Sequence, residues 1–222
     1  MRSLWFGVLV CAAMLVACGG DDSDFATRLR EGSFTDSRDG QTYKTVTIGK
    51  QTWMAEKLNY AYTDVPYSYI FDDSLYTSDS TSWCYDNDPA NCAKYGRLYD
   101  WYGALKACPE GWHLPDSTEW NTLFAAVGGL STAGEMLKST GGWDRSDNGV
   151  SGADAYSFSV LPAGFWYFKG EFKNEGSVAT FWFSMEYNSD YAYFVLLTYD
   201  IVCAVLGNSN KFNGNSVRCV KD

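Results

Sequence analysis

Residues 108–120 read Cys108-Pro109-Glu110-Gly111-Trp112-His113-Leu114-Pro115-Asp116-Ser117-Thr118-Glu119-Trp120. The stretch joins two segments of helical periodicity through a turn that is rich in Pro and Gly. Upstream, residues 96–107 are predicted to form a helix, because apolar side chains recur at i, i+3, i+4 and i+7: Leu98, Trp101, Tyr102 and Leu105. Pro109 ends this helix, since a proline disfavours helical geometry in the residue before it.

A second helix is predicted to begin after Pro115. Asp116 is its expected N-cap, and Glu119 lies where a capping box needs a side chain that reaches back to the cap amide. A short helical turn is expected over residues 134–139. The second helix itself shows the same apolar spacing and then a glycine stop: Trp120, Leu123, Phe124, Val127 and Gly128-Gly129.

The remaining segments are predicted to be strands and turns. β-branched and aromatic residues on both sides of Gly49-Lys50 predict a hairpin over residues 41–54. Residues 60–95 have no sustained period and are expected to form a long loop held by a disulfide. Four further strands are expected, over residues 156–160, 178–184, 191–197 and 215–220. This order contains no βαβ alternation, which predicts an α+β fold.

The N-terminus has the pattern of an export signal. Arg2 precedes an apolar run, residues 4–17, that is too short for a comfortable membrane span and suits a signal peptide, residues 1–17. The run ends in Leu15-Val16-Ala17-Cys18, which resembles a bacterial lipobox and predicts Cys18 as the lipid-anchored first residue of the mature chain. An ordinary secretory signal with an incidental cysteine is the alternative. Residues 18–34 begin with a small, acidic run and are expected to form a flexible tether.

Composition narrows the classes of function. The net charge is −10 and no basic patch is visible, which argues against nucleic acid as a partner. The chain has no C-x-x-C pair, and His113 is its single histidine, which argues against a zinc site. Aromatic residues make up 17% of the chain, and such rings either fill a core or form surfaces that stack against sugars and peptides.

Export implies an oxidising compartment, in which disulfides are the default state of cysteines. Cys11 leaves with the signal peptide and Cys18 is acylated, so five of the seven cysteines remain. Cys203 lies in an apolar run and is expected to be a buried, inert thiol. The other four are predicted to form one local bridge and one that closes nearly the whole domain: Cys84–Cys92 and Cys108–Cys219.

Several motifs, in their order along the chain, resemble a single family. They are Gly40-Gln41-Thr42-Tyr43, Ile48-Gly49-Lys50-Gln51-Thr52-Trp53-Met54-Ala55-Glu56-Lys57-Leu58-Asn59-Tyr60, Trp83-Cys84-Tyr85, Tyr95-Gly96-Arg97-Leu98-Tyr99-Asp100-Trp101, Cys108-Pro109-Glu110-Gly111-Trp112-His113-Leu114-Pro115 and Ser216-Val217-Arg218-Cys219-Val220. Together with the lipobox, they resemble the major paralogous domain lipoproteins of Fibrobacter-type bacteria over residues 35–222.

That family in turn resembles the C-type-lectin-like fold, which formylglycine-generating enzymes share. The resemblance implies a single disulfide-stapled domain, residues 35–222, in which two helices flank a small twisted antiparallel sheet where the termini meet. A bridge from a cysteine near a helix to the last strand is typical of this fold, which supports Cys108–Cys219. The resemblance implies no activity, because fold does not fix function.

Metal and catalytic chemistry find little support in the residue pattern. A lectin-type calcium site needs a proline with carboxylate or amide residues on both sides, and none of the five prolines has them. Asp86 and Asp88 could still offer oxygen ligands to calcium, with a solvated turn as the alternative, and no other cofactor is implied. The copper chemistry of formylglycine-generating enzymes needs a close cysteine pair, whereas Cys203 and Cys219 lie 16 positions apart. His113, at a helix entry, is expected to be structural.

These observations favour a non-catalytic outer-membrane lipoprotein, periplasmic or surface-exposed, that binds polysaccharide or another surface component through aromatic loops. Packing inside the domain is an equal alternative for each candidate ring. Two other functions stay open: a structural or protein-interaction module of the cell envelope and, with less support, an enzyme of the formylglycine-generating type. The candidate contacts lie outside the helical core faces: Trp83, Tyr85, Trp143, Trp166 and Tyr167.

Overall fold

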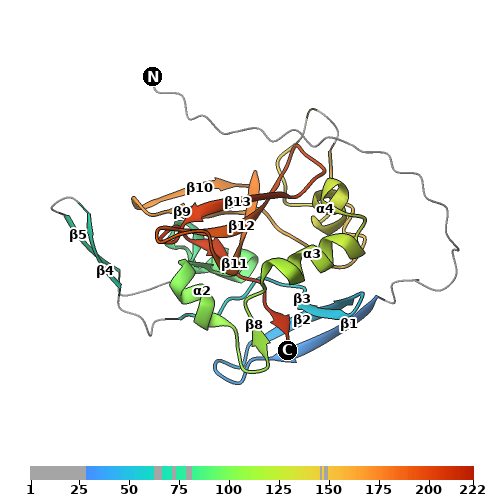
Figure 1. The fold of residues 1–222 in the computed structure, drawn as a ribbon, viewed down its shortest axis with the longest axis horizontal. Helices are drawn as coiled ribbons and strands as arrows, with labels where there is room; N and C mark the ends of the chain where they lie inside the picture. The colour runs from blue at the N-terminus through green and yellow to red at the C-terminus, as the bar shows by residue number, and fades with distance from the viewer. Residues whose placement is uncertain (1–28, 63–66, 72–73, 79–81, 146, 148–149) are drawn as a thin grey trace, which may run out of the picture.

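A computed structural model describes residues 29–62, 67–71, 74–78, 82–145, 147 and 150–222 of the chain. These residues form a mixed fold of helices and sheets (Figure 1). The predicted signal peptide and Cys18 lie outside the described residues. Within the described ranges, no helix is long and apolar enough to cross a membrane.

The smaller sheet brings the two ends of the described chain together. The hairpin predicted over residues 41–54 is confirmed there as β2 and β3. β1 includes residues 30–34 of the segment predicted to be a tether, because its backbone pairs with β2 from Thr42 to Thr47. The strands are all antiparallel and lie in the order β1 (Arg30–Thr35), β2 (Thr42–Ile48), β3 (Gln51–Met54), β15 (Val220–Lys221) and β8 (Trp112–His113).

The larger sheet is mixed, because β11 pairs in parallel with β9 and β14 and antiparallel with β12. The strands predicted over residues 178–184 and 191–197 are confirmed as β11 and β12. The main order is β10 (Glu171–Glu175), β9 (Ala163–Tyr167), β11 (Val178–Glu186), β14 (Asn215–Ser216), β7 (Leu98–Tyr99) and β6 (Ser82–Trp83). β12 (Tyr191–Thr198) extends it to β13 (Val205–Asn210), and a separate hairpin comprises β4 (Tyr67–Phe71) and β5 (Ser74–Ser78).

The closing strand predicted over residues 215–220 is divided between the two sheets. β14 pairs with β7 and β11 in the larger sheet, and β15 pairs with β3 and β8 in the smaller one. Between them, the carbonyl of Val217 accepts a hydrogen bond of 2.9 Å from the amide of Leu58. The carbonyl of Cys219 accepts one of 3.0 Å from the amide of Met54. The C-terminal segment therefore belongs to both sheets.

The helix α3 (Ser117–Ala126) confirms the helix predicted after Pro115. The Asp116 carboxylate accepts a hydrogen bond from the Glu119 amide, and the Glu119 carboxylate accepts one from the Asp116 amide, both at 2.9 Å. This is the predicted capping box. The helix α4 (Leu130–Leu137) begins earlier than the helical turn predicted over residues 134–139.

The helix α2 (Trp101–Ala107) is shorter than the one predicted over residues 96–107, and the predicted start was wrong. Leu98 and Tyr99 form β7, which pairs with β14 and β6. Asp100 caps the helix and accepts a hydrogen bond of 2.6 Å from the amide of Gly103. The apolar Leu98 that suggested a helical stripe is buried by the sheet instead.

Two further predictions need correction. The loop predicted over residues 60–95 contains β6, the 3-10 turn η1 (Tyr85–Asn87) and the helix α1 (Pro89–Tyr95). Asp88 caps α1 and Pro89 is its first residue, a start signal that was overlooked. The strand predicted over residues 156–160 is absent, because Ser157 and Ser159 have positive φ values that a pleated strand does not accommodate.

The core lies on both sides of β11. Phe181 and Phe183 pack with Trp120 of α3, with ring centroids 5.9 and 5.7 Å apart. Trp182 belongs instead to the cluster that contains Ala104 of α2, and its Nε1 donates to the carbonyl of Tyr99 at 2.8 Å. Because successive strand residues point to opposite faces, α2 and α3 pack against opposite faces of β11.

Both predicted disulfides are present. Cys84–Cys92 has an S–S distance of 2.03 Å, and Cys108–Cys219 has one of 2.05 Å and joins residues 111 positions apart. Cys203 lies outside both bonds and is half-buried, whereas the sequence predicted a buried thiol. A mixed fold of helices and sheets with two disulfides is thus confirmed.

His113 lies in β8, just before α3, and both of its ring nitrogens contact carboxylates. Its Nδ1 lies 2.5 Å from Oδ1 of Asp222, and its Nε2 lies 2.7 Å from Oε1 of Glu119. Partial burial disfavours the charged ring, but the hydrogen bonds to Asp222 and Glu119 outweigh it and raise the pKa of His113. The ring therefore connects the C-terminus to the capping box of α3.

The long disulfide should contribute more stability than the short one. The entropy of loop closure predicts a loss of roughly 4.8 kcal/mol for Cys108→Ala/Cys219→Ala and roughly 2.6 kcal/mol for Cys84→Ala/Cys92→Ala. Urea unfolding of the oxidised proteins measures both losses, and the second double variant is the matched control. Equal losses would contradict the assignment of the 108–219 bridge as the main constraint.

The stabilisation from His113 should depend on pH. Because its pKa is raised in the folded protein, the contribution is complete below the unfolded pKa of about 6.5 and is lost as the pH rises through the folded pKa. His113→Asn should cost about 0.5–1 kcal/mol at acidic pH and progressively less at alkaline pH. Urea titrations across this range test the trend, and a cost that does not vary with pH would refute it.

Candidate functional site

A cleft of about 740 Å³ opens between β2, the segment after β3, α1 and the irregular residues that precede β9. This volume is in the range of small-molecule sites in proteins. Its lining combines hydroxyl, carboxylate and ammonium groups with few apolar side chains. The charged and hydroxyl-bearing residues of this lining include Glu31, Lys44, Glu56, Lys57, Lys94, Tyr95, Ser139, Ser157, Ser159 and Arg218.

Lys57 is one of two buried cations in this lining, with only 6% of its surface exposed. Its Nζ donates to the carbonyl of Leu161 at 2.6 Å and lies 5.3 Å from the ring centroid of Phe181. Burial, and to a lesser degree the charge of Arg218, lowers the pKa of Lys57 well below its usual value. The surroundings therefore do not compensate the ammonium charge.

Arg218 is the second buried cation, with 1% of its surface exposed. It donates to the carbonyl of Phe158, and its guanidinium carbon lies 4.1 Å from the ring centroid of that residue. Its Nε has no hydrogen-bond partner among the described residues. Burial lowers the pKa of Arg218 to about 9, although the more distant charges of Asp154 and Glu56 oppose the shift.

The acids near these cations have other partners. Glu31 accepts a hydrogen bond from Ser157 at 2.5 Å, and Glu56 accepts one from the amide of Lys44 at 2.8 Å. Asp154 accepts from the amide and the hydroxyl of Ser159, at 2.7 and 2.6 Å. Within the described ranges, neither Lys57 nor Arg218 forms an ion pair with a carboxylate.

The structure brings together two of the aromatic residues predicted as ligand contacts. The rings of Trp83 and Trp166 stack with centroids 4.1 Å apart and an interplanar angle of 18°, and both side chains are half-buried. A Cβ at Gly214 would lie 2.9 Å from Cβ of Trp166 and 3.2 Å from the Trp83 ring, so the pair rests on a glycine. Tyr167, the next residue of β9, is also half-buried.

Tyr85 and Trp143 are used for packing. Tyr85 is 7% exposed, its ring lies 5.2 Å from that of Phe172, and its hydroxyl accepts from the amide of Glu175 at 3.5 Å. Trp143 packs against the main core cluster, and its Nε1 donates to the carbonyl of Val160 at 3.1 Å. Tyr85 belongs to the domain interior, whereas Trp143 is half-buried and is bonded to the interior through its Nε1.

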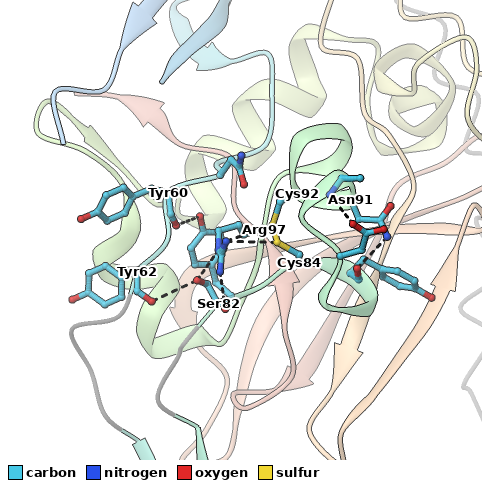
Figure 2. The surroundings of a disulfide bond; sticks show 12 residues. Tyr60, Tyr62, Ser82, Cys84, Asn91, Cys92 and Arg97 are labelled. Atoms are coloured by element: carbon cyan, nitrogen blue, oxygen red, sulfur yellow. Dashed lines mark hydrogen bonds between the residues drawn. A yellow bond between two sulfur atoms is a disulfide. The ribbon is translucent and has the colours of Figure 1, made fainter. Parts of the chain in front are cut away.

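Arg97 holds the segment that carries Trp83 and Tyr85 (Figure 2). Its Nη1 lies 3.6 Å from both sulfur atoms of the Cys84–Cys92 disulfide, and its Nε donates to the hydroxyl of Ser82 at 2.9 Å. The disulfide and the guanidinium therefore position β6 and η1 together.

The two weak calcium candidates lie on the exposed side of this segment. Asp88 uses its carboxylate to cap α1, where it accepts from the amide of Ala90 at 2.9 Å. Asp86 has a positive φ of 54° within η1. Over the part of the chain that the structure describes, no three His, Cys, Asp or Glu side chains gather into a metal-binding group. Cys219 is in a disulfide, which removes it from a copper-binding thiol pair.

Neither Lys57 nor Arg218 was among the residues predicted to bind a ligand. For Arg218 the sequence carries a signal, because this charged residue lies between Val217 and Cys219, which belong to one buried cluster. Lys57 lies between the exposed Glu56 and the buried Leu58, so its signal is weaker.

A family model matches most of the chain. It is described as the Fibrobacter succinogenes major domain and covers residues 46–221, from β2 to β15. No curated protein and no solved structure matches the chain. The matched range contains the two buried cations of the cleft, Lys57 and Arg218, both disulfides and all five aromatic candidates. The chain therefore belongs to the Fibrobacter succinogenes major domain family.

Proposed function

We propose that this chain is a non-catalytic binding module of the bacterial envelope, held at the outer membrane by a lipid on Cys18, with polysaccharide as its ligand. The lipobox at residues 15–18 supports the anchor. The Trp83–Trp166 pair carries the proposal for the ligand, because a rigid pair of half-exposed indoles offers apolar ring faces on which a sugar ring can stack.

A C-type-lectin-like arrangement is part of this proposal. Three features support it: α2 and α3 pack on opposite faces of β11, β1 and β15 lie in one sheet, and the 108–219 bridge joins the end of α2 to the closing segment. The tryptophan pair lies on strands β6 and β9 of the larger sheet, outside both helices.

The tryptophan pair should determine polysaccharide binding. Trp166→Ala removes one indole and exposes the other, and should weaken binding of the mature protein to cellulose or xylan about tenfold or more, as for other central aromatic contacts. Pull-down isotherms on both polysaccharides, preceded by a glycan array, measure the effect.

Trp143→Phe is the matched control, because it changes an indole that is bonded to the interior. It should bind like the unaltered protein, and thermal melting should show that both variants fold. If the unaltered protein binds none of the glycans tested, the polysaccharide proposal is refuted.

A protein-interaction module is the second candidate, and one surface favours it. Among the strands that the structure describes, β13 is an edge strand that pairs with β12 alone, and Leu206 on it is exposed. Tyr187 and Tyr191, at the turn between β11 and β12, are exposed too. An exposed strand edge with apolar side chains is suited to pairing with another chain.

Leu206→Lys should reduce such an association about tenfold or more and leave glycan binding unchanged. Cross-linking in intact cells, followed by affinity measurement with the recovered envelope protein, tests this candidate. Recovery of no defined partner, or equal affinity of the variant, would count against it.

A further inference from the structure

We infer that the cleft between β2 and α1 is a binding site for a small hydroxylated carboxylate of the sugar-acid class, whose carboxylate group lies between Lys57 and Arg218. This site differs from the Trp83–Trp166 surface and is argued from other observations. It therefore stands or fails independently of the proposed function.

Two cations buried side by side require compensation. Lys57 and Arg218 approach the same ring, with Nζ 5.3 Å and the guanidinium carbon 5.6 Å from the centroid of Phe181. Taking one charge out of water is costly, and a second like charge nearby adds repulsion. A carboxylate placed between them would supply the opposite charge that the protein does not.

Two other buried lysines show how this chain normally satisfies such a group. Lys211 forms an ion pair of 2.7 Å with Glu186 and also donates to the carbonyl of Ser189. Lys138 donates to the carbonyls of Thr198 and Ile201. Lys57 donates to one carbonyl in the described structure, although an ammonium has three N–H donors. Lys57 thus has capacity for an added acceptor.

The backbone places both cations on the side of the chain that faces the cleft. The amide of Leu58 donates to the carbonyl of Val217, so the segments that carry Lys57 and Arg218 run side by side. Leu58 and Val217 belong to one buried cluster. Lys57 and Arg218 both line the cleft, whereas their neighbours Leu58 and Val217 pack into that cluster, so the two cations point away from it.

The rest of the lining restricts the ligand. Glu31 and Glu56 also line the cleft and would repel a polyanion, which favours a ligand with a single negative charge. The hydroxyls of Ser139, Ser157 and Ser159 keep lone pairs that can accept from ligand hydroxyls. A small molecule with several hydroxyl groups and one carboxylate fits these side chains and the volume of the cleft.

Calorimetry with galacturonate, galactose and acetate tests the inference on the mature protein. Galacturonate and galactose differ in a carboxylate in place of a hydroxymethyl group, and acetate offers the carboxylate alone. We expect galacturonate to bind and to raise the melting temperature, with galactose and acetate weaker by about tenfold or more. Equal binding of galacturonate and galactose, or no binding of galacturonate, would overturn the inference.

Lys57→Met tests the assigned residue. It should weaken galacturonate binding about tenfold or more, while Lys106→Met, which removes an exposed positive charge outside the cleft, should not. Melting curves check folding, and replacement of an unpaired buried charge by Met should not lower stability. Unchanged affinity in a folded Lys57→Met would refute the assignment, and should that variant not fold, the ligand comparison on the unaltered protein still decides.

Two further arms test the single charge of the ligand and the separation of the two sites. Because Glu31 and Glu56 would repel a polyanion, polygalacturonate should bind more weakly per chain end than free galacturonate, by about tenfold or more. Equal binding per chain end would contradict a ligand with a single negative charge. Trp166→Ala should retain galacturonate binding even where it loses binding to neutral polysaccharide, and a parallel loss of both would contradict a separate site.

Discussion

The fold depends on the C-terminal segment, residues 215–221, and on the disulfide that fixes its middle. β14 completes the larger sheet between β11 and β7, and β15 completes the smaller one between β3 and β8. The Cys108–Cys219 bond attaches this segment to the end of α2, and the His113–Asp222 hydrogen bond attaches the residue that follows it to β8. A segment of this kind leaves little freedom in register, because a slip by one residue would reverse every side chain along it.

That constraint explains the buried charge in the cleft. With Val217 and Cys219 committed to one cluster by alternation and by the disulfide, Arg218 must point to the opposite side, against Phe158 and Phe181. An apolar residue there would be less costly to bury, since a buried cation without a counter-ion opposes folding. The cation therefore costs stability at a position where backbone hydrogen bonds and a disulfide hold both neighbouring residues, which is the arrangement expected when a charged group must stay in place for a ligand.

Local signals predicted the fold where local interactions decide it. The capping box of Asp116 and Glu119 and the glycine-centred hairpin of β2 and β3 depend on residues a few positions apart, and both were predictable. Leu98 fitted a helical stripe equally well, but its pairing with Ser216, far along the chain, places it in a strand. The division of the closing strand between two sheets also arises from non-local pairing, which periodicity in one segment cannot indicate.

Residue type alone does not separate candidate binding residues from the core. Burial of an aromatic side chain stabilises the folded state, so the abundance of such residues does not separate surface from core. Tyr85 and Trp143 pack against other side chains, whereas Trp83 and Trp166 form a half-exposed pair. Burial of a cation at an inward-facing position destabilises the folded state, so the presence of such a cation needs a specific reason. By this argument, the buried cations Lys57 and Arg218 are more informative than the aromatic richness of the whole chain.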